Sequence, residues 1–341
     1  MYKASLHTHK LIFNHPGGTS RGVLTTKMSY YIHIWDEKAP EIRGVGECSI
    51  LPGLSCDDRP QLPEKLKWCC NNINKLLTNF QKELEEWPAI RFALEMAEAD
   101  LKNGGKGIYY HSDFIKGKLE IPINGLIWMG QIEEMKQRIE EKLEQGFNCL
   151  KLKIGALDFD SEIQLLKELR KRFNSETLEL RVDANGAYSP KKAPYILDEL
   201  SKLSLHSIEQ PIKAGLWKQM ADLCANTPLP IALDEELIGL HNTNDRKEMM
   251  SAIKPQYIIL KPSLTGGFSS SEQWMKIAKE VGADWWITSA LEANVGLNAI
   301  AQWTAKQGVT IPQGLGTGQV FSNNTKSRLI MQKGKLKYLP K

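Results

Sequence analysis

The sequence lacks the patterns that mark membrane, secreted and disulfide-rich proteins. No apolar run approaches the roughly 20 residues that span a bilayer, and the start, MYKASLHTHK, has no apolar signal-peptide region. The six cysteines include no C-x-x-C pair and are too sparse for a disulfide scaffold, so we expect reduced thiols. These absences favour a cytoplasmic protein without a membrane partner.

An excess of charge of one sign is missing as well. The 44 basic and 40 acidic residues are spread along the chain and give a formal net charge of +4, with no basic stripe of the kind that follows nucleic-acid phosphates. A nucleic-acid partner is therefore not expected. The 341 residues, 42% of them hydrophobic, can fill a large core, and their number favours one large domain plus a smaller one.

The first 110 residues have the pattern of a small α+β domain. Apolar and polar residues alternate from 5 to 49, which predicts an antiparallel meander, and residues 62–102 have helical spacing. The Gly-rich stretch 15–22 between the first two alternating segments predicts a hairpin connection, and a mobile loop over a site is the alternative. We expect this region to form a domain that caps the rest.

From Ile121 onward, short apolar runs alternate with amphipathic stretches, which is typical of repeated βα units. Seven such runs, with an eighth candidate at 309–311, predict a modified TIM (β/α) barrel over residues 111–312. An open doubly wound sheet is the alternative, but no run is followed by G-x-G-x-x-G. The tail, 313–341, has strand and turn character, and we expect it to return to the capping domain. The seven runs are IPINGLIW, CLKLKIG, LELRVDANG, HSIEQPI, PIALDEEL, YIILKPSL and DWWITSA.

Three acidic residues follow successive runs of this series. Asp183, Glu209 and Asp234 are 26 and 25 residues apart (209 − 183 and 234 − 209), which is about the length of one βα unit. Carboxyl ends of parallel strands meet at one end of a barrel, so we expect the three carboxylates to converge there. Oxygen ligands of this kind suit Mg²⁺, with Mn²⁺ as an alternative. For a single acid, a helix N-cap or a loop charge would explain the residue equally well.

Lysines flank the acidic series on both sides. Lys151 and Lys153 are two apart in one run and hence share a face, and Lys261 follows the run after Asp234. An amine with a pKa near 10.4 needs a fall of about 3 units to act as a base at neutral pH, and burial beside a second ammonium lowers it. A metal facing lysines suits abstraction of the proton α to a carboxylate, because the metal neutralises the enediolate that forms.

Taken together, these motifs resemble those of the enolase superfamily, and within it the muconate-lactonising subgroup. The segment GECSILPGLS, residues 46–55, is also similar to the capping-domain loop of that subgroup, so the resemblance covers nearly the whole chain. The motifs that carry it are K-x-K at 151–153, D-x-N at 183–185, IEQP at 208–211, DE at 234–235 and Lys261.

Within the subgroup, four segments resemble the branch whose members dehydrate SHCHC (2-succinyl-6-hydroxy-2,4-cyclohexadiene-1-carboxylate) to o-succinylbenzoate in menaquinone biosynthesis: RVDANGAYSP, IILKPSLTGG, SALEANVGLNAIAQW and GLGTGQVF. The resemblance implies a Mg²⁺-dependent lyase. Lys153 would remove the α-proton and return a proton to the departing hydroxyl, Lys261 would stabilise the enediolate, and Lys151 would tune Lys153 and touch the substrate carboxylate. The expected substrate contacts are Asn185, Ser289, Asn294, Gly296 and Arg21, although Asn185 could instead only form a turn, and a polar strand end is the alternative for Ser289, Asn294 and Gly296.

Two other functions remain open at this stage. A racemase of N-acylamino acids or an epimerase of dipeptides would use the same metal and lysines, but the D-x-D motif expected of dipeptide epimerases is absent from residues 288–318. A barrel kept only as a binding protein predicts loss of at least one ligand or base. Every expected acid and lysine is present, which favours an enzyme.

Overall fold

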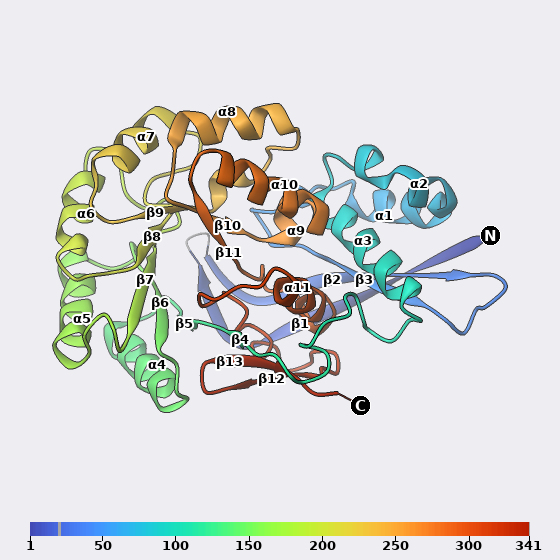
Figure 1. The fold of residues 1–341 in the computed structure, drawn as a ribbon, viewed down its shortest axis with the longest axis horizontal. Helices are drawn as coiled ribbons and strands as arrows, with labels where there is room; N and C mark the ends of the chain where they lie inside the picture. Colours follow the sequence, from blue (N-terminus) through green and yellow to red (C-terminus); the bar gives the residue numbers. More distant parts are fainter. Residues whose placement is uncertain (20–21, 341) are drawn as a thin grey trace.

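The computed structural model describes residues 1–19 and 22–340, and its N-terminal part is a three-stranded antiparallel sheet (Figure 1). The strands, in their spatial order, are β1 (Tyr2–Thr19), β2 (Gly22–Asp36) and β3 (Gly44–Ser49). The alternation over residues 5–49 therefore predicted the meander correctly. The hairpin of β1 and β2 remains paired as far as Thr19 and Gly22.

Three helices pack against one face of this sheet. A hydrophobic cluster of their own, including Ile32, Leu66 and Phe80, fills the space between helices and strands. The helical spacing from 62 to 102 is divided because the backbone leaves the helical region at Asn72, and Pro88, which suits a first helical turn, begins the last helix. The helices are α1 (Leu62–Asn71), α2 (Ile73–Glu83) and α3 (Pro88–Lys102).

The strand β3 approaches helix α3 so closely that only glycine fits at two positions. A Cβ atom on Gly46 would lie 1.8 Å from the carbonyl oxygen of Ala93, and one on Gly44 would lie 2.0 Å from that of Ala97. Real Cβ atoms do not tolerate such distances, so the sequence G-V-G in β3 is needed for this packing.

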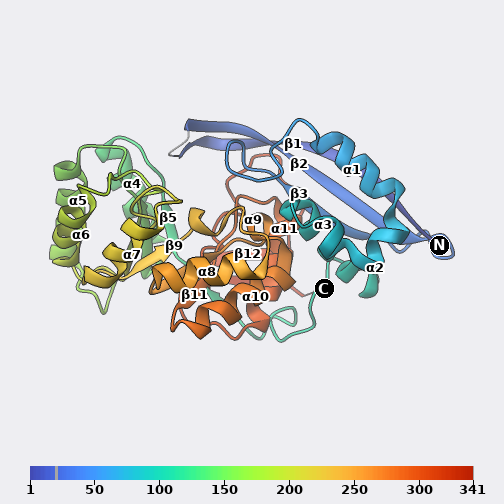
Figure 2. The ribbon, with the colours of Figure 1, turned by 90° about the horizontal axis from the view of Figure 1, so that it is seen from above.

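The larger part of the chain is a curled parallel sheet of seven strands with helices on its outside (Figures 1 and 2). Its spatial order, β11-β10-β9-β8-β7-β6-β5, follows the chain order, as expected for a barrel. The strands are β5 (Gly125–Ile127), β6 (Cys149–Lys153), β7 (Glu179–Asp183), β8 (Ser207–Glu209), β9 (Ile231–Leu233), β10 (Tyr257–Leu260) and β11 (Asp284–Ile287). The helices are α4 (Ile132–Glu144), α5 (Phe159–Arg172), α6 (Ala193–Ser201), α7 (Trp217–Asn226), η1 (Glu235–Leu237), α8 (Thr243–Ile253), α9 (Pro262–Thr265), α10 (Gly267–Glu280) and α11 (Asn294–Lys306).

A short extended segment joins the two edges of the parallel sheet. Gln313 bridges Ile123 beside β5, and Gly314 bridges Thr288 at the end of β11, both in the parallel sense. The eighth barrel position is thus occupied two residues beyond the predicted run 309–311. The modified TIM barrel with a capping domain is the observed fold.

The C-terminal tail contacts both parts of the molecule. A bridge between Phe13 and Phe321 attaches the tail to β1, as the sequence predicted. Further on, the hairpin of β12 (Leu329–Gln332) and β13 (Lys335–Tyr338) pairs with β4 (Ile121–Pro122), which precedes the first barrel strand in the chain. Among the described helices, none has the length and apolar character that a membrane span requires.

Candidate active site

The register of the barrel strands places three of the predicted residues side by side. Lys153 is the Cα partner of Asp183, and Asp183 is the partner of Glu209. Asp234 directly follows the next strand, β9. Because alternate residues of a strand share a face, Lys151 and Lys153 point into the barrel while the buried Leu150 and Leu152 belong to the surrounding hydrophobic core.

The three acidic residues form a buried cluster. Asp183, Glu209 and Asp234 each offer a carboxylate oxygen, and these oxygens all lie within 4.8 Å of one another. The side chains are 0%, 0% and 3% exposed, and Oε1 of Glu209 accepts no hydrogen bond from any residue in the described ranges. Three buried carboxylates repel one another without a cation, and an all-oxygen donor set suits a hard divalent ion. The cluster could therefore hold a metal such as Mg²⁺.

Each lysine is paired with one or two of these carboxylates. Nζ of Lys153 lies 2.6 Å from Oδ2 of Asp183, and Nζ of Lys151 lies 2.7 Å from Oε2 of Glu209 and 3.4 Å from Oδ2 of Asp183. Lys261 forms an ion pair with Asp234 on the other side. The amines therefore compensate the charge that a metal would otherwise balance.

This arrangement shifts the pKa values of the buried groups in different directions. Burial, reinforced by Asp183 and Asp234, raises the pKa of Glu209 to about 7 even though Lys151 opposes the shift. Burial also acts on Asp183, but there the three lysines outweigh it and hold its pKa well below the usual value. Burial would lower the pKa of Lys261, yet Asp234 and the other acids raise it overall. The negative charge of the cluster thus keeps Lys261 protonated in the absence of a metal.

Asn185 links Lys153, the predicted base, to Glu235 by hydrogen bonds. Its Oδ1 accepts a hydrogen bond from Lys153 at 2.7 Å, and its Nδ2 donates to Oε1 of Glu235 at 2.9 Å. Its φ of 44° lies in the left-handed region, which asparagine tolerates better than most residues. Asn185 therefore forms the turn and also lines the cavity, while its contact with a substrate stays a prediction.

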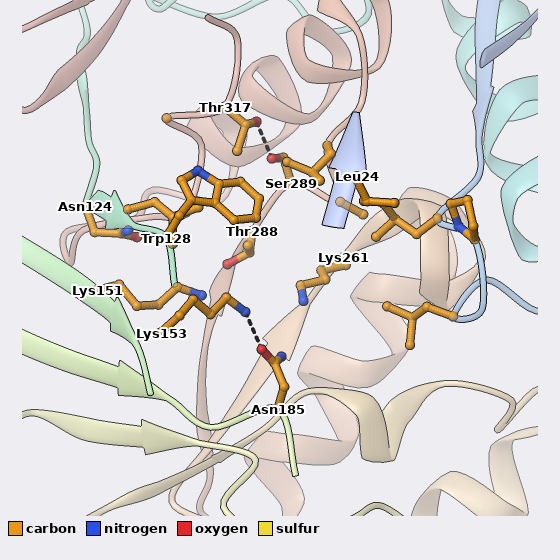
Figure 3. A pocket seen from close by; sticks show the side chains of 18 of the residues that line it. Leu24, Asn124, Trp128, Lys151, Lys153, Asn185, Lys261, Thr288, Ser289 and Thr317 are labelled. Atoms are coloured by element: carbon orange, nitrogen blue, oxygen red, sulfur yellow. Dashed lines mark hydrogen bonds between the residues drawn. The ribbon is translucent and has the colours of Figure 1, made fainter. Parts of the chain in front are cut away.

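A cavity of about 230 Å³ lies over the lysines, between the barrel and the capping domain (Figure 3). Lys153 and Lys261 enter it from opposite sides, and Asn185 lies below Lys153 in this view. Such opposed amines can exchange protons with both faces of a bound molecule.

The lining of the cavity includes residues that the sequence did not single out. Oδ1 of Asn124 and Oγ1 of Thr288 are buried and have no hydrogen-bond partner within residues 1–19 and 22–340, so both are available to a ligand. Asn124 lies in the middle of the first apolar run and Thr288 near the end of the seventh, so their positions in the series were the only signal that could have indicated them. The capping domain contributes an apolar wall, part of which lies in the segment 46–55 that resembles the capping-domain loop of the subgroup. The wall consists of Val23, Leu24, Leu51, Pro52 and Leu54, with Trp128 of the barrel beside it.

Of the predicted substrate contacts, some line the cavity and others lie away from it. Ser289 lines the cavity, where its hydroxyl is hydrogen-bonded to that of Thr317 (Figure 3). Asn294 does not line it: its amide group donates to the carbonyl of Thr325. Gly296 also lies elsewhere, since its N–H donates to Glu47 at 2.8 Å. The structure thus gives no support to Asn294 and Gly296 as substrate contacts, because the first turn of α11 binds protein groups, and for both residues the contact stays a prediction. Arg21 lies outside the described residues.

The modified TIM barrel with a capping domain and the buried acidic cluster beside opposed lysines together define a class of protein. The comparison with family models identifies the same class. The enolase C-terminal domain-like family model matches residues 134–335, and the chain belongs to this family. The chain is 48% identical to the o-succinylbenzoate synthase of Desulfotalea psychrophila over 96% of both proteins. It superposes on the crystal structure of MenC from the same organism with a TM-score of 0.87 and 45% identity, over 98% of this chain and 99% of that one.

More distant relatives share the fold. A dipeptide epimerase from Enterococcus faecalis, solved in complex with Mg and the dipeptide L-Leu-L-Tyr, superposes with a TM-score of 0.82 over 99% of this chain and 97% of that one. Its sequence is only 19% identical, so the likeness concerns the architecture alone. The comparisons therefore favour the synthase branch of the family over the epimerases.

Proposed function

We propose that the protein is a Mg²⁺-dependent lyase that dehydrates SHCHC to o-succinylbenzoate. Its relative with 48% identity is named an o-succinylbenzoate synthase. The observation that carries the proposal is the pair of amines, Lys153 and Lys261, that face each other across the cavity above the acidic cluster. The similarity over 96% of both chains supports the same reaction.

Asp183, Glu209 and Asp234 would hold the metal. When bound, Mg²⁺ would neutralise the negative charge that develops on the substrate carboxylate as the α-proton leaves. The fit rests on the all-oxygen donor set and on the buried Oε1 of Glu209 that accepts no hydrogen bond within the described residues. Mn²⁺ has similar preferences and is an alternative.

The lysines perform the proton transfers. The neutral amine of Lys153 takes the α-proton, and the electron pair of the broken C–H bond passes into the enediolate. The resulting ammonium then gives this proton to the hydroxyl group that departs from the neighbouring carbon, so that water leaves and the ring becomes aromatic. Lys261, kept as a cation by its acidic neighbours, stabilises the enediolate, and Lys151 tunes Lys153 through the shared Asp183.

The remaining lining would hold the substrate. Leu24, Leu51 and Leu54 would cover the apolar ring and the methylene groups of the succinyl chain, and Asn124 and Ser289 would bind its polar ends. We further propose a small-molecule carboxylate as the partner, a cytoplasmic location in keeping with six unbridged cysteines, and domain boundaries at 110 and 312.

The decisive experiment measures turnover of SHCHC beside exchange of the α-hydrogen in N-succinyl amino acids, with and without Mg²⁺. We expect conversion of SHCHC that requires the metal and is abolished in Lys153→Ala. The control is Lys167→Ala, which removes an exposed lysine of α5 and should leave turnover unchanged. Exchange of the α-hydrogen in an N-succinyl amino acid, without conversion of SHCHC, would show that the protein is a racemase and not the proposed synthase.

A further inference from the structure

A second buried cluster of charged groups lies beside the cavity, between the capping sheet and the barrel. It consists of Lys27 on β2, Glu47 on β3 and Glu292 in the loop between β11 and α11, which are 3%, 0% and 0% exposed. None of the three contacts the acidic triad or the catalytic lysines in the interactions described above. Charges so deeply buried are retained only where they are paired and hydrogen-bonded, so the cluster calls for an explanation of its own.

Most of its hydrogen bonds go to one stretch of backbone. Lys27 donates to the carbonyl oxygen of Leu291 at 2.7 Å, and Glu292 accepts from the N–H of Ala290 at 2.7 Å. Glu47 accepts from the N–H groups of Ala293 and Gly296, each at 2.8 Å. Lys27 and Glu47, each more than 200 residues away in the sequence, thus fix this loop from the side of the capping sheet, and Glu292 fixes it from within.

The stretch that they hold has an unusual conformation and forms part of the cavity. Leu291 has a φ of 58°, in the left-handed region that a leucine rarely adopts. Ser289, Ala290 and Leu291 all line the cavity. A strained backbone at a binding site persists only when its surroundings determine it, and here Lys27 binds the carbonyl of the strained residue itself.

The cluster also connects this wall to helix α9, which begins directly after Lys261. Oε1 of Glu292 accepts a hydrogen bond from the hydroxyl of Ser263, two residues beyond Lys261. On the capping side, Ser29 donates to Glu47 at 2.8 Å, and Ser49 accepts from Lys27. Every charged member therefore has partners in its own domain or across the domain boundary.

We propose that Lys27, Glu47 and Glu292 are positioning residues that hold the turn 289–293 as a wall of the substrate cavity, so that they set substrate affinity rather than the rate of the proton transfers. The inference rests on the proposed function in one respect, namely that the substrate occupies this cavity. It extends that function by making the docked capping sheet a determinant of substrate binding.

The first test is Lys27→Met, which keeps most of the length of the side chain and removes its charge and hydrogen bonds. We expect KM for SHCHC to rise about tenfold while kcat falls less than about threefold, because bound substrate still meets intact lysines and acids. The matched control is Lys10→Met, an exposed lysine on the neighbouring strand of the same hairpin. An unchanged KM, or a loss confined to kcat, would overturn the proposal.

A second readout needs no substrate. Hydrogen–deuterium exchange of the amides of Ala290, Ala293 and Gly296 should accelerate in Lys27→Met and not in Lys10→Met. Unaltered exchange would refute the positioning role even if the protein has a different substrate, whereas failure of the wild type to convert SHCHC would refute only the proposed reaction.

If Lys27→Met does not fold, Ser49→Ala removes one partner of Lys27 with little change in volume. It should also raise KM and accelerate the exchange of the three amides, but to a smaller extent, with KM rising about twofold to threefold. Normal KM and normal exchange in a folded Ser49→Ala protein would then count against the proposal.

Discussion

The two walls of the cavity consist of different types of residue. The barrel wall is charged, and its lysines and acids lie in adjacent positions of a regular sheet, where Lys153 pairs with Asp183 and Asp183 with Glu209. The capping wall is apolar and comes from a hairpin and a loop, with Leu24, Leu51 and Leu54. The residues for the reaction chemistry thus lie on the barrel, and those that recognise the shape of the substrate lie on the capping domain.

This difference separates the two kinds of effect that a substitution can have. A change in the barrel wall alters charge where the enediolate forms, so it should lower kcat. A change in the capping wall removes contacts that are equal for substrate and transition state, so it should raise KM. Substitutions on either side can therefore test whether the division holds.

The largest effect is expected from the metal cluster. Glu209→Gln replaces a buried carboxylate at the centre of the triad and should lower kcat by at least about a thousandfold, or about 4 kcal/mol, since both a ligand and a charge are lost. Calorimetric titration with Mg²⁺ should show weakened binding in the same variant. Glu176→Gln, in an exposed loop before β7, is the control. Full activity of Glu209→Gln would exclude the cluster as the metal site.

Lys261→Ala should have the next largest effect. Removing the cation that faces Lys153 should lower kcat about a hundredfold, because the enediolate loses a fixed charge in a site of low dielectric constant. The measurement is steady-state turnover of SHCHC, with Lys276→Ala on the exposed side of α10 as the control. A rise in KM at constant kcat would instead show that Lys261 only binds the substrate.

The contrast between the walls also explains what the sequence could predict. Strand spacing is a local property, so residues 153, 183, 209, 234 and 261 could be brought together from their separations alone. The resemblance of residues 46–55 placed Leu51 and Leu54 in the capping-domain loop, but it could not show that they face a cavity, because a leucine such as Leu54 has the same pattern whether it is covered or not. The sequence also could not show that the N–H of Gly296 donates to Glu47, because Glu47 is 249 positions away and the two residues meet only through domain docking.

The packing that supports the capping wall can be broken without touching the cavity. Gly46→Ala would force a methyl group to within 1.8 Å of the carbonyl oxygen of Ala93, so β3 and α3 must separate. We expect the free energy of unfolding to fall by about 3 kcal/mol, measured by urea denaturation. Gly17→Ala is the control in the same sheet, since its nearest neighbour would be at an ordinary 3.5 Å. Equal stabilities of the two variants would mean that β3 and α3 adjust without cost.

The smallest effect, and the most direct test of the division, is expected from Leu54→Ala. Leu54 belongs to the apolar wall and touches neither the lysines nor the acids in any interaction described above. Truncation uncovers part of the bound ring, which should raise KM by about tenfold, or about 1.4 kcal/mol, and leave kcat within about twofold. Leu54→Met keeps the apolar volume and should restore KM. A fall in kcat with unchanged KM would show that the capping wall shapes the transition state, and shape and chemistry would then not be separable between the two walls.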